Sequence, residues 1–466
     1  MRIQLYRQLP APVRHALLKA YSRLPIQWRF GGAYWRTRRL IASAESWDSE
    51  AIRTWQFGRL RQLIDRTWHD VPGYRRLWSA AGFGPGDLRT LDDFRHLPGI
   101  TKAELSGNLP EFTSRRLPAW NRVYRTTAGS TGIPFGFHLP ADAIDQEWAF
   151  MHSAWERTGW RLGDRSAVLR GAWVGTQENF WSEDPHLGHL LLSTYELTAD
   201  TWPAYRDRIE AFGAKHLQAY PSAASLLADI VLADPGHESP TLRTIFLGSE
   251  NLYGFQRERI AQAFPGSRLF SWYGHAEQAV FAPECELSTR FHLHPLYGFT
   301  EILDAGGREV EEGGSGEIVA TSFWNHATPF IRYRTMDFAT TGPMSCTACG
   351  RPHRLLDHID GRLQEMIITA TGRWISMTAI NMHSNVFDDI RQFQFHQREP
   401  GKVTFRFIPK AGYAPHAEQG IREALEAKLG RDMELTISRV DTLSRAKNGK
   451  FRFLEQELPL RYGDRA

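Results

Sequence analysis

The stretch RTTAGSTGIP, residues 125–134, packs three Thr, one Ser and two Gly into ten positions. Small hydroxyl residues and glycines let a backbone turn tightly and aim N–H and O–H donors at one point, which suits a phosphate oxyanion. The stretch is not a Walker loop, because no Lys follows its last Gly. We interpret it as a candidate phosphate-binding loop, with a plain surface loop as the alternative.

The length and composition around this stretch describe a globular protein of more than one domain. At 466 residues the chain exceeds a single hydrophobic core, so we expect at least two domains. Its 42% hydrophobic and 23% charged residues are ordinary for a soluble protein. A net charge of +4 does not by itself imply a nucleic-acid partner, and the sequence carries no RNA- or DNA-binding signature.

The cysteine count and the hydropathy pattern predict a cytoplasmic protein. Only three Cys occur, which makes no disulfide framework and favours a reducing compartment. No run of 18 apolar residues predicts a transmembrane helix, and no apolar segment near the start predicts a signal peptide.

Residues 1–44 form a basic stretch with nine Arg or Lys and no acidic residue. Apolar residues recur in it at helical spacing, from Val13 through Leu17 to Leu24. Such a helix can lie on an anionic membrane surface, here as a peripheral contact at the inner membrane. The alternative is a helix that packs on its own domain and keeps a solvated basic face.

The middle of the chain alternates strands and helices, which predicts an α/β sheet. Short apolar strands are expected at 216–220, 242–247 and 268–272, with helices at 222–231 and 255–264; Ser222 is expected to cap the first helix, with Pro221 outside it. Ligands of such sheets bind beyond the carboxyl ends of the strands. A strand-rich region follows. After residue 360 a small α+β unit is predicted, so we expect domains at 1–360 and 361–466.

Six motifs in this order resemble the adenylate-forming superfamily, in particular the phenylacetate–CoA ligase branch and its capsule-biosynthesis relatives. The motifs are TTAGSTGIP (126–134), LGSE (247–250), SWYGHAE (271–277), IRYRTMDFA (331–339), DGRLQEMI (360–367) and RAKNGKFR (445–452). The resemblance implies an α/β fold, with a large multi-sheet N-terminal domain and a small mobile α+β C-terminal domain. It also implies ATP as substrate and Mg²⁺ as its counterion.

The resemblance also implies a role for individual residues. The expected nucleotide-binding residues are Thr126, Thr127, Gly129, Ser130, Thr131, Gly132, Gly248, Ser249, Glu250, Tyr273, Gly274, Asp337 and Arg362. Asp337 would accept from two ribose hydroxyls, and the ring of Tyr273 would face adenine. Glu277 would help bind Mg²⁺, with a surface carboxylate as the alternative. Arg332 or Arg334 could reach a phosphate, or form a structural ion pair.

Lys450 is the residue that we expect to promote adenylation. A long ammonium on a Gly-bearing loop can reach between a carboxylate and the α-phosphate, and leave again. The alternative is an exposed Lys. By resemblance, the C-terminal domain then swings about a hinge near Arg362 and Gln364, which removes Lys450 and admits the acceptor.

The sequence departs from the family pattern at several motif positions. Ala128 stands where many relatives have Ser or Gly, and Ile133 where many have Lys. Gln364 replaces a usual Asp or Lys at the hinge. His275 and Ala276 replace small hydroxyl residues before Glu277. These changes bear on rate and acceptor rather than on the fold.

All three cysteines lie within 65 residues and predict a metal site. Cys346-x-x-Cys349 has zinc-knuckle spacing, and Cys285, His292 and His294 lie upstream. Some members of the phenylacetate–CoA ligase branch look similar here. We expect a closed structural Zn²⁺ on Cys285, His292, Cys346 and Cys349, with His294 in reserve. Three unrelated buried thiols are the alternative.

The predicted function is ATP-dependent activation of an aryl or acyl carboxylic acid as acyl-AMP, followed by transfer to CoA. An alternative transfers the acyl group or AMP to an amine or hydroxyl acceptor in surface-polysaccharide biosynthesis, and a non-enzymatic scaffold is the third hypothesis. The acid and the oligomeric state are left open. The pocket that binds the acid is expected among residues such as Trp173, Tyr220, Trp272 and His275.

Overall fold

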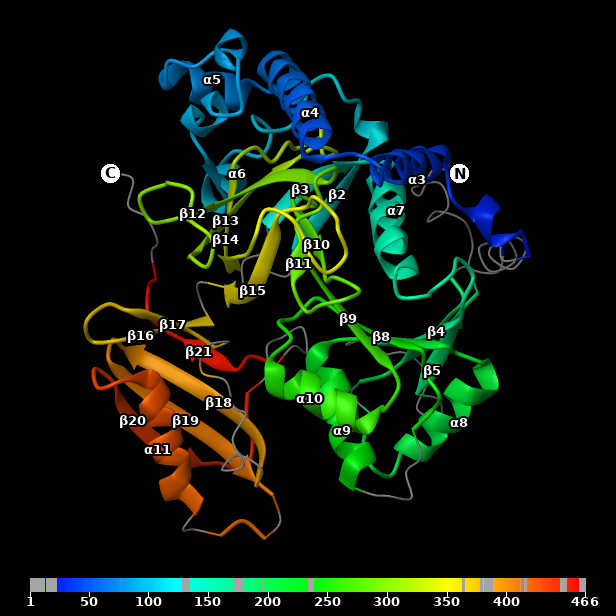
Figure 1. Ribbon diagram of the computed structural model, residues 1–466, viewed down its shortest axis with the longest axis vertical. Coiled ribbons are helices and arrows are strands. Elements are labelled where there is room, and N and C mark those ends of the chain that lie inside the picture. Colours follow the sequence, from blue (N-terminus) through cyan, green and yellow to red (C-terminus); the bar gives the residue numbers. More distant parts are fainter. Residues whose placement is uncertain are drawn as a thin grey trace. The chain divides into compact units, whose positions relative to one another are not determined.

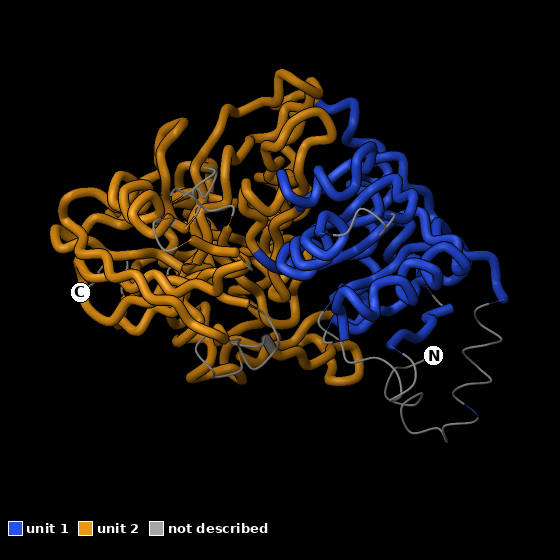
Figure 2. The backbone as a smooth tube through the Cα atoms, turned by 90° about the horizontal axis from the view of Figure 1, so that it is seen from below, with its two compact units in different colours: residues 1–47, 141–250, 258–271 blue, residues 48–140, 251–257, 272–466 orange. Residues whose placement is uncertain are grey.

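A computed structural model of the chain describes most residues. The described residues are 13, 23–127, 135–170, 180–185, 187–194, 196–233, 239–362, 365–377, 380, 389–410, 412–414, 417–444 and 451–460. The chain divides into two compact units (Figure 2). Unit 1 comprises 1–47, 141–250 and 258–271, and unit 2 comprises 48–140, 251–257 and 272–466. In the described part, no helix is long and apolar enough to cross a membrane.

Unit 1 is built on a largely parallel sheet (Figure 1). Its strands are β4 (Ser166–Leu169), β5 (Trp181–Asp184), β6 (His189–Leu192), β7 (His216–Ala219), β8 (Thr244–Leu247) and β9 (Arg268–Gly274), with helices α8 (Trp202–Phe212), α9 (Pro221–Ala233) and α10 (Gly254–Ala263). They run in the order β9-β8-β7-β4-β6-β5, and only β5 is antiparallel to its neighbour. Strands β7 and β8 are buried along their whole length, as expected for central parallel strands. The carboxyl ends of β4, β7, β8 and β9 therefore share one edge.

Helices α3 (Gly32–Ala44) and α7 (Ala143–Glu156) pack together in unit 1, after the short helix η1 (Ile26–Arg29). The hydroxyl of Tyr34 lies 3.0 Å from Nδ1 of His152, and both side chains are buried. Burial lowers the pKa of His152 to about 3, so this imidazole is neutral in the folded protein. The helix predicted from Val13 to Leu24 lies almost wholly outside the described residues, so both interpretations of it stay predictions.

Unit 2 contains a second, mostly antiparallel sheet. Its strands are β1 (Ile100–Thr101), β11 (Phe291–His292), β12 (Gly298–Leu303), β13 (Ser315–Ser322), β14 (Tyr333–Thr341) and β15 (Leu355–Arg362), in the order β11-β15-β14-β13-β12 with β1 parallel to β14. Other elements of this region are α4 (Ser49–Asp70), α5 (Pro72–Ala80), η2 (Pro85–Asp87), η3 (Asp93–His96), α6 (Lys102–Gly107), η4 (Ala119–Asn121), the hairpin β2 (Arg122–Thr127) and β3 (Phe135–Pro140), and β10 (Phe281–Pro283). β10 pairs with the last three residues of β9, which belong to unit 2.

The C-terminal part of unit 2 is a small α+β structure. It contains β16 (Met366–Ile368), β17 (Trp374–Ser376), β18 (Ile390–Glu399), β19 (Lys402–Pro409), α11 (Ala417–Leu429), β20 (Glu434–Arg439) and β21 (Leu454–Gln456), with the sheet order β20-β19-β18-β21. Phe395, Phe405 and Phe407 are fully buried, and α11 adds Leu425 and Leu429 to their cluster. The alternation of apolar and polar residues along β19 places its phenylalanines on one face.

The sequence-based fold class is confirmed: the chain combines α/β sheets with a distinct C-terminal α+β part. The boundary at residue 360 stays a prediction. One local prediction was wrong. α9 begins at Pro221 rather than after a Ser222 cap, and the backbone N–H of Ser222 donates to Glu250 Oε2 at 3.0 Å. A carboxylate from a distant residue thus satisfies this helix terminus, which local sequence rules do not reveal.

Candidate functional site

Three predicted nucleotide-binding residues of unit 2 meet at one place. Tyr273 is the second-last residue of β9, Asp337 lies in β14, and Arg362 ends β15, where it pairs in register with Asp337. The Tyr273 hydroxyl donates to Asp337 Oδ2 at 2.6 Å, and Arg362 Nε lies 3.4 Å from Asp337 Oδ1. Each carboxylate oxygen of Asp337 thus has one polar neighbour. The charge of Asp337 is the main cause of a raised pKa at Arg362.

Glu277 lies in the turn after β9 and is buried beside the same group. His275 Nδ1 lies 3.2 Å from Glu277 Oε2, and the Tyr333 hydroxyl donates to Glu277 Oε1 at 3.4 Å. Burial alone raises the pKa of Glu277, but the nearby His275 outweighs burial, and the pKa falls below its ordinary value. Burial alone lowers the pKa of His275, and Glu277 reverses this, so that pKa is raised. The two side chains stabilise each other as an ion pair.

Strained backbone flanks both carboxylates. Gln278, next to Glu277, has φ of 55°, and Met336, next to Asp337, has φ of 59°. Arg332 has φ of 47°. A non-glycine residue in this region costs about 1–3 kcal/mol and persists where surrounding contacts enforce it, often at functional sites. Each acidic residue thus has a neighbour held in an unfavourable backbone conformation.

The predicted hinge segment begins at the tightly packed end of β15, next to an irregularity in its pairing with β14. Gly361 has φ of 107°, and a Cβ there would meet Glu365 Oε2 at 2.7 Å and Asn251 Nδ2 at 3.1 Å. Glu365 Oε2 accepts from the backbone N–H of Arg362 at 3.3 Å, and burial raises the pKa of Glu365. Gln364 lies outside the described residues. A glycine is therefore required at this position of β15 both by conformation and by space.

The LGSE motif lies in unit 1, at the carboxyl end of β8. Gly248 donates its N–H to Ala219 O at 3.4 Å, Ser249 has φ of 68°, and Glu250 accepts from Ser222 as described above. Gly274, in unit 2, pairs with Phe281 of β10.

The predicted phosphate-binding loop and the loop that carries Lys450 lie mostly outside the described residues. Thr126 is exposed on β2, and Thr127 pairs through its backbone with Phe135. Gly129, Ser130, Thr131, Gly132 and Lys450 lie outside the described residues, as does Trp173 of the expected acid pocket. Their roles stay predictions.

Arg332 and Arg334 form structural ion pairs, the alternative stated from the sequence. Arg332 donates from Nε and Nη2 to the two oxygens of Glu301 at 2.9 and 3.0 Å, and its Nη1 donates to Arg95 O at 2.6 Å. Arg334 donates to Glu317 Oε2 from Nε at 2.8 Å. The Arg332–Glu301 pair is almost completely buried.

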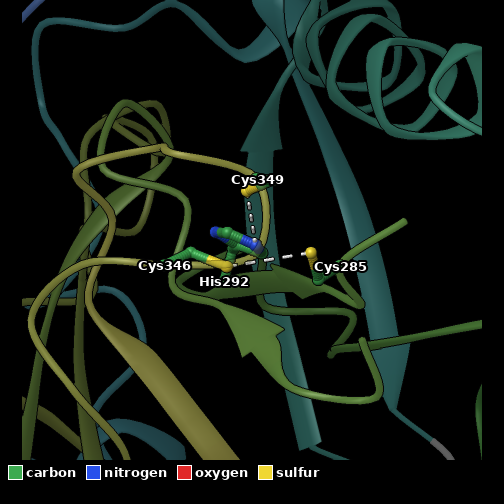
Figure 3. Close-up of side chains that lie close together, drawn as sticks. All are labelled: Cys285, His292, Cys346 and Cys349. Atoms are coloured by element: carbon green, nitrogen blue, oxygen red, sulfur yellow. Dashed lines mark hydrogen bonds between the residues drawn. The ribbon is translucent and has the colours of Figure 1, made fainter. Parts of the chain in front are cut away.

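The cysteine motif builds a second candidate site in unit 2 (Figure 3). One ligand atom from each of Cys285, His292, Cys346 and Cys349 lies within 4.8 Å of the others. Cys285 Sγ is 3.8 Å from Cys346 Sγ, and Cys349 Sγ is 3.6 Å from His292 Nε2. Tetrahedral zinc, with Zn–S of about 2.3 Å and Zn–N of about 2.0 Å, separates two sulfurs by about 3.8 Å and a sulfur and a nitrogen by about 3.5 Å. The four residues therefore fit Zn²⁺.

Backbone turns hold these ligands. Gly350 donates its N–H to Cys346 O at 2.8 Å and has φ of 77°, which closes the knuckle between the two cysteines. The N–H of Leu287 donates to Cys285 Sγ at 3.4 Å. His294 is not in the four-residue set; its ring is tilted by 50° against that of His353, and its Nδ1 accepts from the N–H of Leu296.

Tyr333 and Glu365 are site residues that the sequence analysis did not single out. Both lie inside quoted motifs, IRYRTMDFA and DGRLQEMI. The available signal was their place within those motifs, since an aromatic residue in a strand and a Glu in a turn are unremarkable by themselves.

Comparisons with known proteins show which sequences and folds this chain resembles. Residues 367–457 match the family model of the CapK C-terminal domain. Over 336 residues the chain is 26% identical to phenylacetate-coenzyme A ligase of Escherichia coli (strain K12), covering 68% of this chain and 73% of that protein. The corresponding ligase of Aromatoleum evansii is 24% identical over 429 residues, covering 84% of this chain and 90% of that protein. Protein CapK of Staphylococcus aureus is 23% identical, covering 54% and 55% of the two chains.

The fold also matches a solved structure. A 2-hydroxyisobutyryl-CoA ligase, crystallised in its postadenylation state, aligns with a TM-score of 0.68, covers 88% of this chain and 90% of its own, and is 19% identical. That identity supports a shared fold alone. By sequence the chain is similar to phenylacetate–CoA ligases and to CapK, and its fold is that of a CoA ligase of the adenylate-forming type.

Proposed function

We propose that this enzyme activates a carboxylic acid with ATP as an acyl-adenylate and then transfers the acyl group to CoA. The observation that carries the proposal is the group in which Tyr273 and Arg362 bracket Asp337, with Glu277 beside it. Phenylacetate–CoA ligases are similar to this chain over most of its length, which supports CoA as the acceptor.

In the first half-reaction, a carboxylate oxygen attacks the α-phosphorus of ATP and pyrophosphate leaves. Both reactants are anions, so oriented donors and positive charge must offset their repulsion. Asp337 binds the ribose hydroxyls, and Lys450 and the hydroxyls of residues 126–132 stabilise the negative charge of the phosphates. Glu277 would hold Mg²⁺, which would supply positive charge against the phosphates.

In the second half-reaction, the thiol of CoA attacks the acyl carbonyl and AMP leaves. Rotation of residues 361–466 about the segment near Arg362 takes Lys450 away and opens the path for the thiol. The positive φ of Gly361, at the end of β15, supports a hinge here, because glycine can adopt backbone conformations that other residues resist.

An ATP–pyrophosphate exchange assay with a panel of aryl and acyl acids tests the first half-reaction. We expect exchange that depends on one acid class and is lost in Lys450→Ala. No exchange with any acid of the panel would contradict the proposal.

A second function shares the adenylation but uses an amine or hydroxyl acceptor in surface-polysaccharide synthesis. The match of residues 367–457 to the CapK C-terminal domain favours it. Turnover that consumes ATP and acid without CoA, and that an added amine or sugar accelerates, would support this function over CoA ligation.

A peripheral membrane contact through the basic N-terminal stretch would suit a lipid-linked acceptor. Removal of residues 1–22 tests it, because a longer deletion would remove α3, which packs against α7. Loss of sedimentation with anionic vesicles after this deletion supports the contact, and unchanged sedimentation rejects it.

We also propose one structural Zn²⁺ per chain on Cys285, His292, Cys346 and Cys349. With four protein ligands the site is closed, so the metal would hold turns together rather than take part in catalysis. Elemental analysis of protein purified without chelators tests this assignment, and absence of zinc would remove it.

A further inference from the structure

A buried glutamine joins the two ends of the segment that carries Lys450. Gln394 lies on β18 and is 1% exposed. Its amide nitrogen donates to the carbonyl oxygen of Ser444 at 3.3 Å and to that of Arg452 at 2.9 Å. Both hydrogens of the amide are thus used on backbone carbonyls that precede and follow residues 445–451, here called the Lys450 segment.

The two carbonyls meet at one nitrogen although they lie eight residues apart in the sequence. Extended chain from Ser444 to Arg452 could span about 26–29 Å. In the structure both carbonyl oxygens lie within 3.3 Å of the Gln394 amide nitrogen. Gln394 therefore holds together the two ends of the Lys450 segment.

The two ends are anchored in different ways. At the downstream end, β21 runs parallel to β18 (Figure 1), and the N–H of Phe395 donates to Phe453 O at 2.7 Å. At the upstream end, Ser444 is exposed, its Oγ lies 3.2 Å from Gln394 Oε1, and it donates to Glu455. Backbone pairing holds the first end and side chains hold the second, so loss of the Gln394 amide should release mainly the upstream end.

We propose that Gln394 is a positioning residue for adenylation: it fixes both ends of the Lys450 segment, so that the Lys450 ammonium can reach the reacting carboxylate and α-phosphate. The inference rests on the proposed function. Gln394 acts through Lys450 rather than on the substrate itself. A displacement of about 1 Å at a reacting group can cost about 10²-fold in rate, so the first half-reaction depends on this tie. The second half-reaction takes place with Lys450 withdrawn and does not need it.

Two variants of β18 separate this role from the general stability of the C-terminal part. Gln394→Met keeps the length of the side chain and most of its packing, and it removes the two donors. The matched control is Gln397→Met. Gln397 is 0% exposed on the same strand, and its amide also donates to backbone carbonyls, those of Ile368 at 2.8 Å and Lys402 at 3.2 Å, which lie outside the Lys450 segment.

The activity experiment measures the two half-reactions of the full chain separately. Phenylacetate is the probe acid, or, if wild type does not use it, the acid of the panel with the fastest pyrophosphate exchange. The second half-reaction starts from the chemically prepared adenylate of that acid and CoA. We expect Gln394→Met to lower kcat for exchange at least about 10-fold, with KM for ATP within about 3-fold and thioester formation within about 2-fold of wild type. Gln397→Met should change both half-reactions by the same factor.

A second measurement needs neither acid nor CoA. Trypsin cleaves after Lys450, and mass spectrometry gives the initial rate of this cleavage. That rate is divided by the rate of cleavage after Lys428 in α11, which reports general unfolding of the same part of the chain. We expect the ratio to rise at least about 5-fold in Gln394→Met and to stay within about 2-fold in Gln397→Met, since only the first variant frees an end of the Lys450 segment.

The possible outcomes decide between the role of Gln394 and the proposed function. Equal losses in both half-reactions of Gln394→Met, an unchanged exchange rate, or an unchanged cleavage ratio would overturn the role of Gln394. If Gln394→Met does not fold, Gln394→Asn, whose amide is too short to reach both carbonyls, is compared in the same way, and changes of less than about 3-fold overturn that role.

Failure of the proposed function has a different signature. If wild type supports exchange with no acid, the proposed adenylation fails, whereas the cleavage ratio still shows whether Gln394 holds the Lys450 segment. If wild type supports exchange but forms no thioester, only CoA as the acceptor is wrong, and kcat for exchange together with the cleavage ratio decides the role of Gln394.

Discussion

Replacing Arg332 by Leu should destabilise the sheet of unit 2 by about 3–5 kcal/mol, because it leaves a buried carboxylate without its partner. The side chains of Arg332 and Glu301 are 5% and 4% exposed. Arg332 donates two hydrogen bonds to Glu301 and two more to the carbonyls of Arg95 and Leu97. The substitution removes all four bonds and the compensating charge together.

The loss of stability in Arg332→Leu should grow as the pH rises. Burial raises the pKa of Glu301 above its ordinary value even with Arg332 present. A carboxyl group whose pKa is raised in the folded state favours folding below its unfolded pKa, and that advantage is lost as the pH rises through the folded pKa. In Arg332→Leu the carboxyl group of Glu301 can be neutral near pH 5. Near pH 8 it is either buried as an unpaired charge or protonated at a cost in free energy. The loss of stability is therefore smaller at pH 5.

Native-state hydrogen exchange read by mass spectrometry on peptides from β12 and β14 is the suitable assay, because it reports this sheet without assuming that a chain of two units unfolds in one step. The double variant Glu301→Leu/Arg332→Leu is the control. Replacing a buried ion pair by apolar side chains is often neutral or stabilising, so most of the protection should return.

Two results would refute this reasoning. One is unchanged exchange in Arg332→Leu, and the other is a double variant no more protected than the single one. A large loss of ATP affinity in Arg332→Leu without loss of protection would instead restore Arg332 as a phosphate contact.

The remaining predictions concern other parts of the molecule. Asp337→Asn should weaken ATP binding about 10–100-fold, since one charged acceptor serves the ribose hydroxyls, while free adenine should bind unchanged; equal ATP affinity by calorimetry would contradict its role. Cys346→Ser should lower the bound zinc measured by elemental analysis to well below one per chain, and a full complement would speak against the ligand set. His152 has a folded pKa of about 3 against 6.5 unfolded, so the stability of unit 1 should fall by up to about 1.4 kcal/mol per pH unit from pH ~6.5 to ~3, and His152→Phe should flatten this slope in acid unfolding curves. Gly361→Ala should slow the complete reaction more than pyrophosphate exchange, because a Cβ would meet Glu365; equal effects on both would argue against a hinge there.

Sequence patterns predicted the elements of this fold well where the signal is local. The strand, helix and turn alternation from residue 216 to residue 274 corresponds to β7, α9, β8, α10 and β9, and the small C-terminal unit follows the expected strands. The start of α9 was missed because Glu250, twenty-eight residues away, supplies its terminal acceptor. No local rule contains that contact.

In the candidate sites, too, some residues could be predicted from the sequence and others could not. Cys285 and His292 could be grouped with Cys346 and Cys349 because zinc ligands have a restricted chemistry and spacing. The role of Arg332 could not be decided, since its partner Glu301 belongs to another strand and carries no motif. Likewise, nothing in the sequence shows that both ring nitrogens of His275 are buried without a hydrogen-bond partner among the described residues.

The parallel pairing of β1 with β14 means that β1 is synthesised long before the strand it pairs with. Ile100 pairs with Tyr333, so the partner of an early segment is translated only after the central part of unit 1. At about 5–20 residues per second, a ribosome needs roughly 10–45 s to pass from one to the other. During this interval the nascent chain carries an incomplete sheet, while residues 141–271 can already collapse into their own core. Chaperone occupancy and protease sensitivity on the ribosome should therefore concentrate on residues 48–140 until β14 has emerged.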